Sequence, residues 1–425
     1  LSAFSLRPRC FLALVALALR TLLVGVWAPG PLTEVGSQQD AALFVTETLP
    51  VLSEGGGLRS IELMHLVATV LKARLCIFPR LNPGSDAAFE GATVIGDQSG
   101  LTTRTFPSGS VISNYPELTR QHRLTYAMLA MWSYHVAPSG DVHLTIPELN
   151  IPQVRSHAPE ACVVVFTDDI QHRRFRIEMN LSAESSARLA NRELDAYLAA
   201  DGVFFASRED REEVEALMWR RRTAVGASPT RQMPALLTLP YAGSEAVTSR
   251  GLASWWRGPH QRARSRAPPL LLYLGSSGGS NKRAVSWLVH EVMPLIRARL
   301  PQQNLSLAGN PRLASEFAGE PTWFGGKYRA HVFPGVPLDV LGFVEDLDEL
   351  LSRTTVLLLP TFVDSGVTTK VIAGIRARVP IVTTSIGRRG IWHPGDSLPP
   401  ACQSASTPPL LLRDTPSSFA AAVLE

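Results

Sequence analysis

The stretch Val356–Ile391 constrains the fold more than any other part of the chain. It opens with a short apolar run, Val356–Pro360, of the kind found in strands that are covered on both faces of a parallel sheet. A helix is predicted to begin near Ser365-Gly366 and to end at a proline, which cannot continue it. The β-branched run Ile381–Thr384 then predicts a second strand. Strand, helix and strand form a βαβ unit with a right-handed crossover, which implies a parallel sheet.

The same alternation of apolar strands and helices extends through the rest of the chain. Further strands are predicted at Ala41–Thr46, Arg74–Phe78, Asp141–Ile146, Ala161–Phe166, Gly202–Ala206, Ala235–Pro240, Pro269–Leu274 and Asn304–Ala308. Helices are predicted at Leu58–Leu71, Pro116–His135, Arg208–Arg221 and Asn281–Arg299. This order predicts an α/β protein with two Rossmann-like, doubly wound parallel sheets.

Composition marks the domain boundaries. Residues 243–268 are rich in arginine, tryptophan and proline, which favours a linker over a nucleic-acid patch. We therefore expect an N-terminal domain at 38–242 and a C-terminal domain at 269–425 that is truncated at its end. Residues 1–37 hold a hydrophobic segment and a linker. The net charge of +4 is small for 425 residues, so no nucleic-acid partner is expected.

The apolar segment 11–28 suggests a membrane association. Arg7 and Arg9 precede it, Arg20 interrupts it, and the next basic residue is Arg59. That asymmetry favours a signal anchor or signal peptide, with the bulk of the chain in the secretory pathway. The alternative is a buried or truncated helix in a cytoplasmic protein.

The four cysteines show no recognisable metal or disulfide pattern. Cys10, Cys76, Cys162 and Cys402 form no CxxC pair, so we expect no metal site and no disulfide scaffold. Cys76 and Cys162 lie inside apolar runs, where cysteine usually packs as a small hydrophobic residue.

Several residues lie where parallel α/β sheets bind ligands, just beyond strand ends and at the first turns of helices. Gly56 and Gly57 precede a predicted helix and permit close approach of the backbone. Lys282 lies in the first turn of another helix, where a cation opposes the helix dipole unless it faces an anion. Asp169 and His172 follow a buried strand; capping of the next helix is an equally good role for Asp169.

Longer segments resemble a known family. The C-terminal half contains LLLYLGSSGGSNKRAVSWLVHEVMPLIRARLPQQNLSLAGN, VLGFVEDLDELLSRTTVLLLP and SGVTTKVIAGIRARVPIVTTSIGRRGI. Together they resemble the donor domain of group 1 (family 4) glycosyltransferases, which have the GT-B fold of two Rossmann-like domains facing a cleft. LFVTETLPVLSEGGGLRSIELMHLV, VVVFTDDIQHRRF and YLAADGVFFASREDREEV resemble the first domain of that family more loosely.

The resemblance implies a retaining glycosyltransferase of the hexosyltransferase type. It would use a nucleotide-sugar donor, no metal and no other cofactor, and its acceptor would be a carbohydrate, lipid or protein. The implied catalytic residues are Asp169 and His172. The implied donor-binding residues are Gly56, Gly57, Lys282, Asp364, Ser365, Gly366, Val367 and Lys370.

One departure from the family pattern lies in the opening stretch. The family places glutamates at two positions that hold ribose or sugar hydroxyls, and the aligned residues here are Ser365 and Ala373. The alternative hypothesis is therefore a non-catalytic GT-B protein that binds nucleotide or glycan without turnover. A sugar-nucleotide epimerase is a third, less favoured interpretation.

Overall fold

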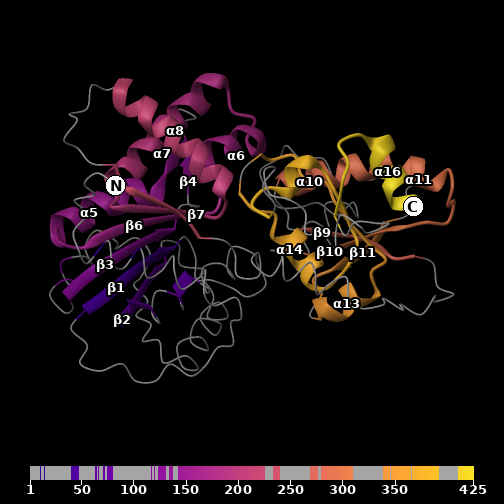
Figure 1. Cartoon of the computed structure of the whole chain (residues 1–425), viewed down its shortest axis with the longest axis horizontal. Coiled ribbons are helices and arrows are strands. Elements are labelled where there is room, and N and C mark those ends of the chain that lie inside the picture. Colours follow the sequence, from indigo (N-terminus) through magenta and orange to yellow (C-terminus); the bar gives the residue numbers. More distant parts are fainter. Residues whose placement is uncertain are drawn as a thin grey trace, which may run out of the picture. The chain divides into compact units, whose positions relative to one another are not determined.

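The structure, a computed structural model, divides into two compact units (Figure 1). Unit 1 comprises residues 1–176 and 181–242, and unit 2 comprises residues 177–180 and 243–425. The structure describes residues 10, 14, 40–46, 63, 64, 66, 70, 71, 74–79, 116, 119, 123–130, 134–136, 142–224, 233–239, 269–275, 279–309, 338–344, 346–364, 366–391 and 410–425.

Unit 1 is built on a six-stranded parallel sheet in the order β2-β1-β3-β6-β7-β8. Its strands are β1 (Asp40–Thr46), β2 (Arg74–Pro79), β3 (Arg123–Ala130), β6 (Cys162–Thr167), β7 (Gly202–Phe205) and β8 (Ala235–Thr238). Its helices include α5 (Thr145–His157), α6 (Gln171–Glu178), α7 (Ala183–Ala199) and α8 (Arg208–Ala224). The short strands β4 (Tyr134–Val136) and β5 (Val142–Leu144) pair antiparallel.

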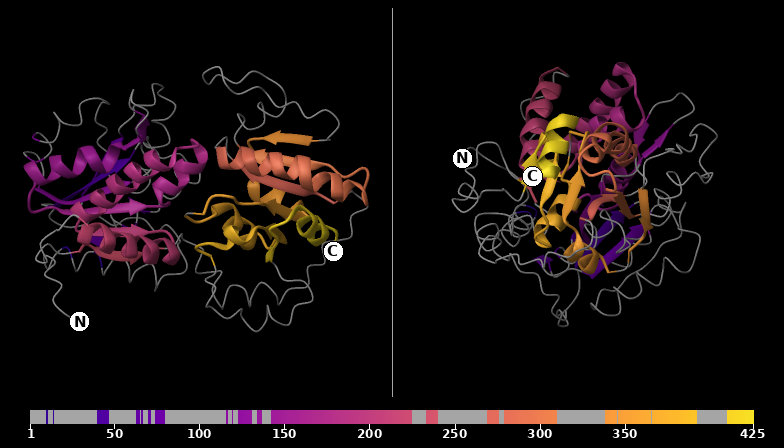
Figure 2. Two further views of the ribbon diagram at one scale, coloured as in Figure 1. Left: turned by 90° about the horizontal axis from the view of Figure 1, so that it is seen from above. Right: turned by 90° about the vertical axis from the view of Figure 1, so that its right-hand side faces the viewer.

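The centre of this sheet is covered on both faces. Every residue of β6 is buried, as the continuous apolar run predicted. Phe166 of β6 stacks on Phe204 of β7, with ring centroids 5.3 Å apart, and lies 6.2 Å from Phe44 of β1. Helices flank the sheet in each unit (Figure 2), as expected for a doubly wound architecture.

The predicted helix Pro116–His135 is wrong at residues 123–130 and 134–135, which are strand, whereas Pro116 and Thr119 are helical. Residues 123–130 form β3, which pairs with β1 and β6 near the middle of the sheet. The run Ala127–Ala130 is fully buried, and its alanine, methionine and leucine favour a helix in isolation. Packing between two strands and burial of both faces override that preference.

The strand predicted at Asp141–Ile146 is shorter than expected, and a helix follows it at once. β5 ends at Leu144, and α5 begins at Thr145 despite containing Pro152. The side chain of Glu148 accepts the main-chain amide of Leu144 at 3.0 Å, which satisfies a donor at the start of the helix. The prolines obscured this helix in the sequence.

Two residues near the N-terminus lie in the core of unit 1. Cys10 and Leu14 are both buried, and Leu14 lies against Gly202 of β7, where an added Cβ would come within 2.8 Å of it. No helix among the described residues is long and apolar enough to cross a membrane. Leu14 is the only described residue within the segment 11–28, so the rest of the predicted membrane-associated segment lies outside the described residues.

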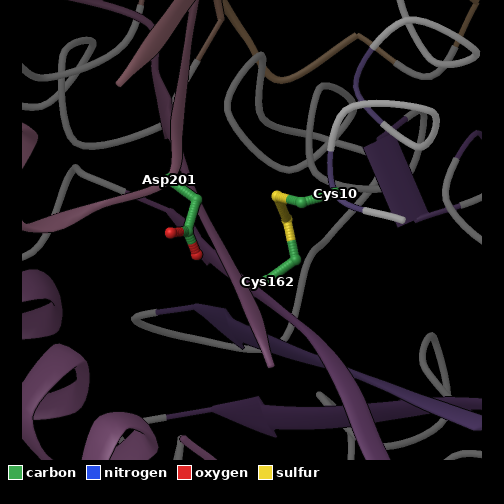
Figure 3. A group of neighbouring side chains, drawn as sticks. All are labelled: Cys10, Cys162 and Asp201. Carbon is green, nitrogen blue, oxygen red and sulfur yellow. A yellow bond between two sulfur atoms is a disulfide. The ribbon is translucent and has the colours of Figure 1, made fainter. Parts of the chain in front are cut away.

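Cys10 and Cys162 form a disulfide, which corrects the expectation that Cys162 packs as a simple hydrophobic residue (Figure 3). Asp201 lies beside the two sulfur atoms. Its carboxylate accepts the amide of Val163 at 2.8 Å and pairs with Arg155 at 3.0 Å. Since the sulfurs are bonded to each other and the carboxylate has these partners, the cluster is explained without a metal ion.

Unit 2 contains a second six-stranded parallel sheet, in the order β11-β10-β9-β12-β13-β14. Its strands are β9 (Leu271–Gly275), β10 (Leu305–Gly309), β11 (Leu338–Gly342), β12 (Val356–Leu359), β13 (Ile381–Thr383) and β14 (Leu410–Leu412). Its helices include α10 (Gly279–Trp287), α11 (Met293–Arg297), α13 (Leu347–Arg353), α14 (Thr369–Arg376) and α16 (Pro416–Leu424), with a π-helical turn at Leu288–Val292 and a 3-10 turn at Ser385–Arg388.

The stretch Val356–Ile391 contains the predicted βαβ unit, formed by β12, α14 and β13. Gly374 explains how closely its helix packs, because a Cβ there would lie 2.5 Å from Leu357 and 2.8 Å from Ile381. A glycine that weakens the helix in isolation thus allows α14 to pack tightly on the two strands.

Candidate functional site

The sheet of unit 2 has a topological switch point between β9 and β12. The two strands are neighbours, with Val356 paired to Leu271, but the chain continues from β9 to β10 on one side and from β12 to β13 on the other. In open α/β sheets, ligands bind outside the carboxyl ends of the strands at such a point. Helix α10 follows β9 and helix α14 follows β12, so their first turns both lie there.

A half-buried lysine connects these two helices. Lys370 lies in the first turn of α14 and donates a hydrogen bond to Oδ1 of Asn281, in the first turn of α10. Its Nζ is also 3.3 Å from the hydroxyl oxygen of Tyr273 and 4.9 Å from the centre of that ring. Tyr273 is buried on β9, and its hydroxyl donates to the same Asn281 oxygen at 3.0 Å.

The charge of Lys370 is poorly compensated. The residue is half-buried, and this burial lowers the pKa of Lys370 to about 7. Burial likewise raises the pKa of Tyr273, which keeps that hydroxyl protonated. No carboxylate among the described residues pairs with Lys370. An anion beside the ammonium would supply the missing charge.

Glycines keep side chains away from the same edge of the sheet. Gly275 and Gly309 end the paired strands β9 and β10. Gly309 has a φ of +135°, and a Cβ there would lie 1.9 Å from the carbonyl oxygen of Gly275. Both the backbone conformation and the close approach therefore require glycine.

The structure places the other predicted donor residues differently. The residue of α10 that contacts Lys370 is Asn281 and not its neighbour Lys282, which had been expected as a second cation. Asp364 forms an ion pair with Arg389 at 2.7 Å. Gly366 is buried with a φ of +71°, and Val367 is half-buried. Ser365, Gly56 and Gly57 lie outside the described residues.

Tyr273 and Asn281 were missed by the sequence analysis. Tyr273 could have been identified from its position, two residues before the glycine that ends a buried strand. Asn281 gave no signal of its own, since asparagine is common at helix starts.

In unit 1, Asp169 and His172 follow β6 but have different partners. The carboxylate of Asp169 pairs with Arg174 at 2.8 Å. His172 lies in the first turn of α6, with Nδ1 2.7 Å from the carboxylate of Glu193. Glu193 also accepts hydrogen bonds from the main-chain amides of Gln171 and His172. It therefore caps the start of α6 at these two amides, a role that the sequence had suggested for Asp169.

The two units differ in their similarity to known proteins. Residues 268–425 match the family model described as Glycosyl transferases group 1. The resemblance seen in the sequence is thereby confirmed for the C-terminal half. No curated protein matches the chain in sequence.

Solved structures extend the likeness to both units at the level of fold. The trehalose-6-phosphate synthase OtsA matches with a TM-score of 0.51 and 12% identity, over 90% of each chain. The α,α-trehalose 6-phosphate synthase of Burkholderia multivorans matches at 0.49 and 13%, covering 91% of this chain and 88% of its own. Anabaena HepE, in complex with UDP and glucose, matches at 0.48 and 13%, covering 90% and 88%. The predicted fold, two parallel-sheet α/β units of the GT-B type, is confirmed.

Proposed function

We propose that the protein transfers a sugar from a nucleotide-sugar donor to a hydroxyl-bearing acceptor. The observation that carries this proposal is the ammonium of Lys370 at the switch point of a group 1 glycosyl transferase domain, with neutral partners only among the described residues. A donor diphosphate would supply the counter-charge that the protein does not.

The surroundings of Lys370 suit a diphosphate. The first turns of α10 and α14 present main-chain amides and the positive end of the helix dipole, which favour negative charge. Asn281 and Tyr273 fix the direction of the ammonium before the ligand arrives, so little reorganisation is needed when charge develops on the leaving diphosphate. These groups would thus bind the donor and stabilise its departure.

Asp169 and His172 are proposed to position the acceptor. Both follow the carboxyl end of β6 in the middle of the unit 1 sheet, where polar side chains face the ligand crevice of such folds. Retention of anomeric configuration and independence from metal are carried over from the family resemblance. The Cys10–Cys162 disulfide favours the oxidising secretory pathway over the cytosol, because disulfides persist in oxidising compartments.

Ala373 limits what the donor site can contribute. It lies in α14, less than one turn beyond Lys370, where the family has a carboxylate for ribose or sugar hydroxyls. A charge-assisted hydrogen bond of that kind is worth about 1.5–3 kcal/mol. Donor affinity is therefore expected to depend unusually strongly on Lys370.

A thermal-shift titration with nucleoside diphosphates and their sugars tests the proposal. A ligand that binds only the native state stabilises it by about 2.7 kcal/mol at one hundred times its dissociation constant. We expect at least one nucleotide sugar to raise the melting temperature and to release free diphosphate when acceptors are supplied. Lys370→Met should abolish the shift, while the control variant Arg353→Met, at an exposed position in α13, should retain it.

The results separate the two functions considered. Binding and product release support a transferase. Binding without turnover, with turnover appearing in Ala373→Glu, supports the non-catalytic protein instead. If no nucleotide sugar binds the full chain, both hypotheses fail.

A further inference from the structure

Glu193 of α7 is a buried carboxylate that the sequence gave no reason to single out. It is 0% exposed. One oxygen, Oε1, accepts the amide of Gln171 at 2.8 Å and the hydroxyl of Tyr197 at 2.8 Å. The other, Oε2, accepts the amide of His172 at 3.0 Å and lies 2.7 Å from its Nδ1. Two carboxylate oxygens offer about four acceptor sites, so these four contacts saturate the group.

This saturation determines the tautomer of His172. An ionised carboxylate only accepts hydrogen bonds, so the nitrogen facing it, Nδ1, must carry a hydrogen. In a neutral imidazole the other nitrogen, Nε2, is then an acceptor. Nε2 has no hydrogen-bond partner among the described residues. It is also not fully buried. The side chain is 14% exposed, so its acceptor nitrogen is open to solvent.

The same carboxylate also fixes the position of the ring. Glu193 binds the first two amides of α6 and the imidazole at once, so helix and side chain share one anchor. Tyr197, one turn further along α7, donates to Glu193 and lies 3.4 Å from the hydroxyl of Thr167 at the end of β6. Burial raises the pKa of Tyr197, which keeps it a donor.

A second histidine in unit 1 shows that a nearby glutamate does not by itself decide the tautomer. Nδ1 of His143 lies 3.2 Å from Glu148 but only 2.6 Å from a guanidinium nitrogen of Arg192. Guanidinium groups can only donate, so Nδ1 of His143 is the acceptor. The tautomer of His172 therefore depends on the hydrogen-bond donors around Glu193, and not only on the presence of a glutamate.

We propose that Glu193 is a positioning residue that holds His172 as the Nδ1–H tautomer and presents Nε2 as the hydrogen-bond acceptor for a hydroxyl of the sugar acceptor. The identity of that hydroxyl rests on the proposed function. The tautomer does not, because it follows from contacts within unit 1 alone. Support of a ring nitrogen by a buried carboxylate is a common way to orient histidine and raise its basicity.

Histidine-selective ¹⁵N labelling of the full-length protein tests this assignment. Long-range ¹H–¹⁵N spectra above the titration of histidine distinguish the two tautomers, and His172→Gln identifies the resonances. In the wild type we expect Nδ1 of His172 at the protonated position and Nε2 at the unprotonated one. Glu193→Gln should shift both toward the averaged position, because its amide can donate to Nδ1.

Matched variants keep the test specific. Tyr197→Phe removes a donor to Oε1 and leaves Oε2 facing the imidazole, so the His172 signals should stay in place. Glu148→Gln should move the His143 signals and not those of His172.

The outcomes distinguish the two proposals. If His172 of the wild type is protonated on Nε2, the inference is wrong, whether or not Glu193→Gln folds. If Glu193→Gln folds and the His172 signals are unchanged, the inference is also wrong. If the spectra are as expected but no nucleotide sugar binds, the proposed function fails and the role of Glu193 stands.

Discussion

Each unit has a charged group near the carboxyl end of its parallel sheet, but the surroundings of the two groups differ. The carboxylate of Glu193 in unit 1 is surrounded by four hydrogen-bond donors. The ammonium of Lys370 in unit 2 has two neutral oxygens and an aromatic ring, and no carboxylate among the described residues. A satisfied buried charge organises the fold around it, whereas an unsatisfied one costs free energy until a ligand arrives.

The largest expected effect is the loss of Glu193. Glu193→Ala leaves two helix amides, an imidazole nitrogen and a buried hydroxyl without their acceptor, and removal of one partner from a buried charged network costs about 3–5 kcal/mol. We expect this decrease in the free energy of unfolding in urea. Glu184→Ala, on the exposed start of the same helix, is the matched control and should change stability by less than about 0.5 kcal/mol. Equal effects of the two variants would show that Glu193 is not the anchor described.

Lys370 should behave in the opposite way. Replacing a buried charge with an apolar side chain of similar volume is often stabilising, by about 1–4 kcal/mol. Lys370→Met should therefore raise the free energy of unfolding of the ligand-free protein while removing nucleotide binding. Lys282→Met gives the baseline for loss of a nearby charge. A Lys370→Met protein that is less stable and still binds nucleotide would remove the contrast between the two units.

The stability contributed by Lys370 should depend on pH. The pKa of Lys370 lies near 7 in the native state, below its ordinary value of 10.5, so the unfolded chain binds the extra proton between these values. The unfolding free energy of the wild type relative to Lys370→Met should thus rise with pH across this window, by about 1.4 kcal/mol per pH unit. The destabilisation is fully present below pH 7. Urea titrations at pH 6, 8 and 9 measure it, and a flat difference would refute the lowered pKa.

The smallest expected effect concerns the residue that orients the ammonium. Asn281→Ala removes a neutral hydrogen-bond acceptor, which is worth about 0.5–1.5 kcal/mol. We expect nucleotide affinity to fall by the corresponding few-fold factor in calorimetry, because Lys370 keeps its charge but loses its fixed direction. A loss as complete as that of Lys370→Met would instead make Asn281 a direct ligand of the nucleotide.

Sequence patterns within one short stretch predicted the part of the site that this stretch forms by itself. The β12-α14-β13 unit and the place of Lys370 follow from an apolar run, a proline and a glycine within one stretch. The partners of Lys370 lie 89 and 97 residues away, and Glu193 lies 21 residues from His172. Such pairs depend on how strands are ordered in the sheet. The same ordering converts Arg123–Ala130 from a predicted helix into a central strand.

The disulfide between Cys10 and Cys162 has a consequence for the integrity of the chain. The two cysteines are 152 residues apart, so everything between them belongs to one covalent ring. A protease that cuts the ring once would leave both pieces attached, and the nicked protein would keep its full mass on a non-reducing gel. Only a thiol reagent would then release the N-terminal fragment.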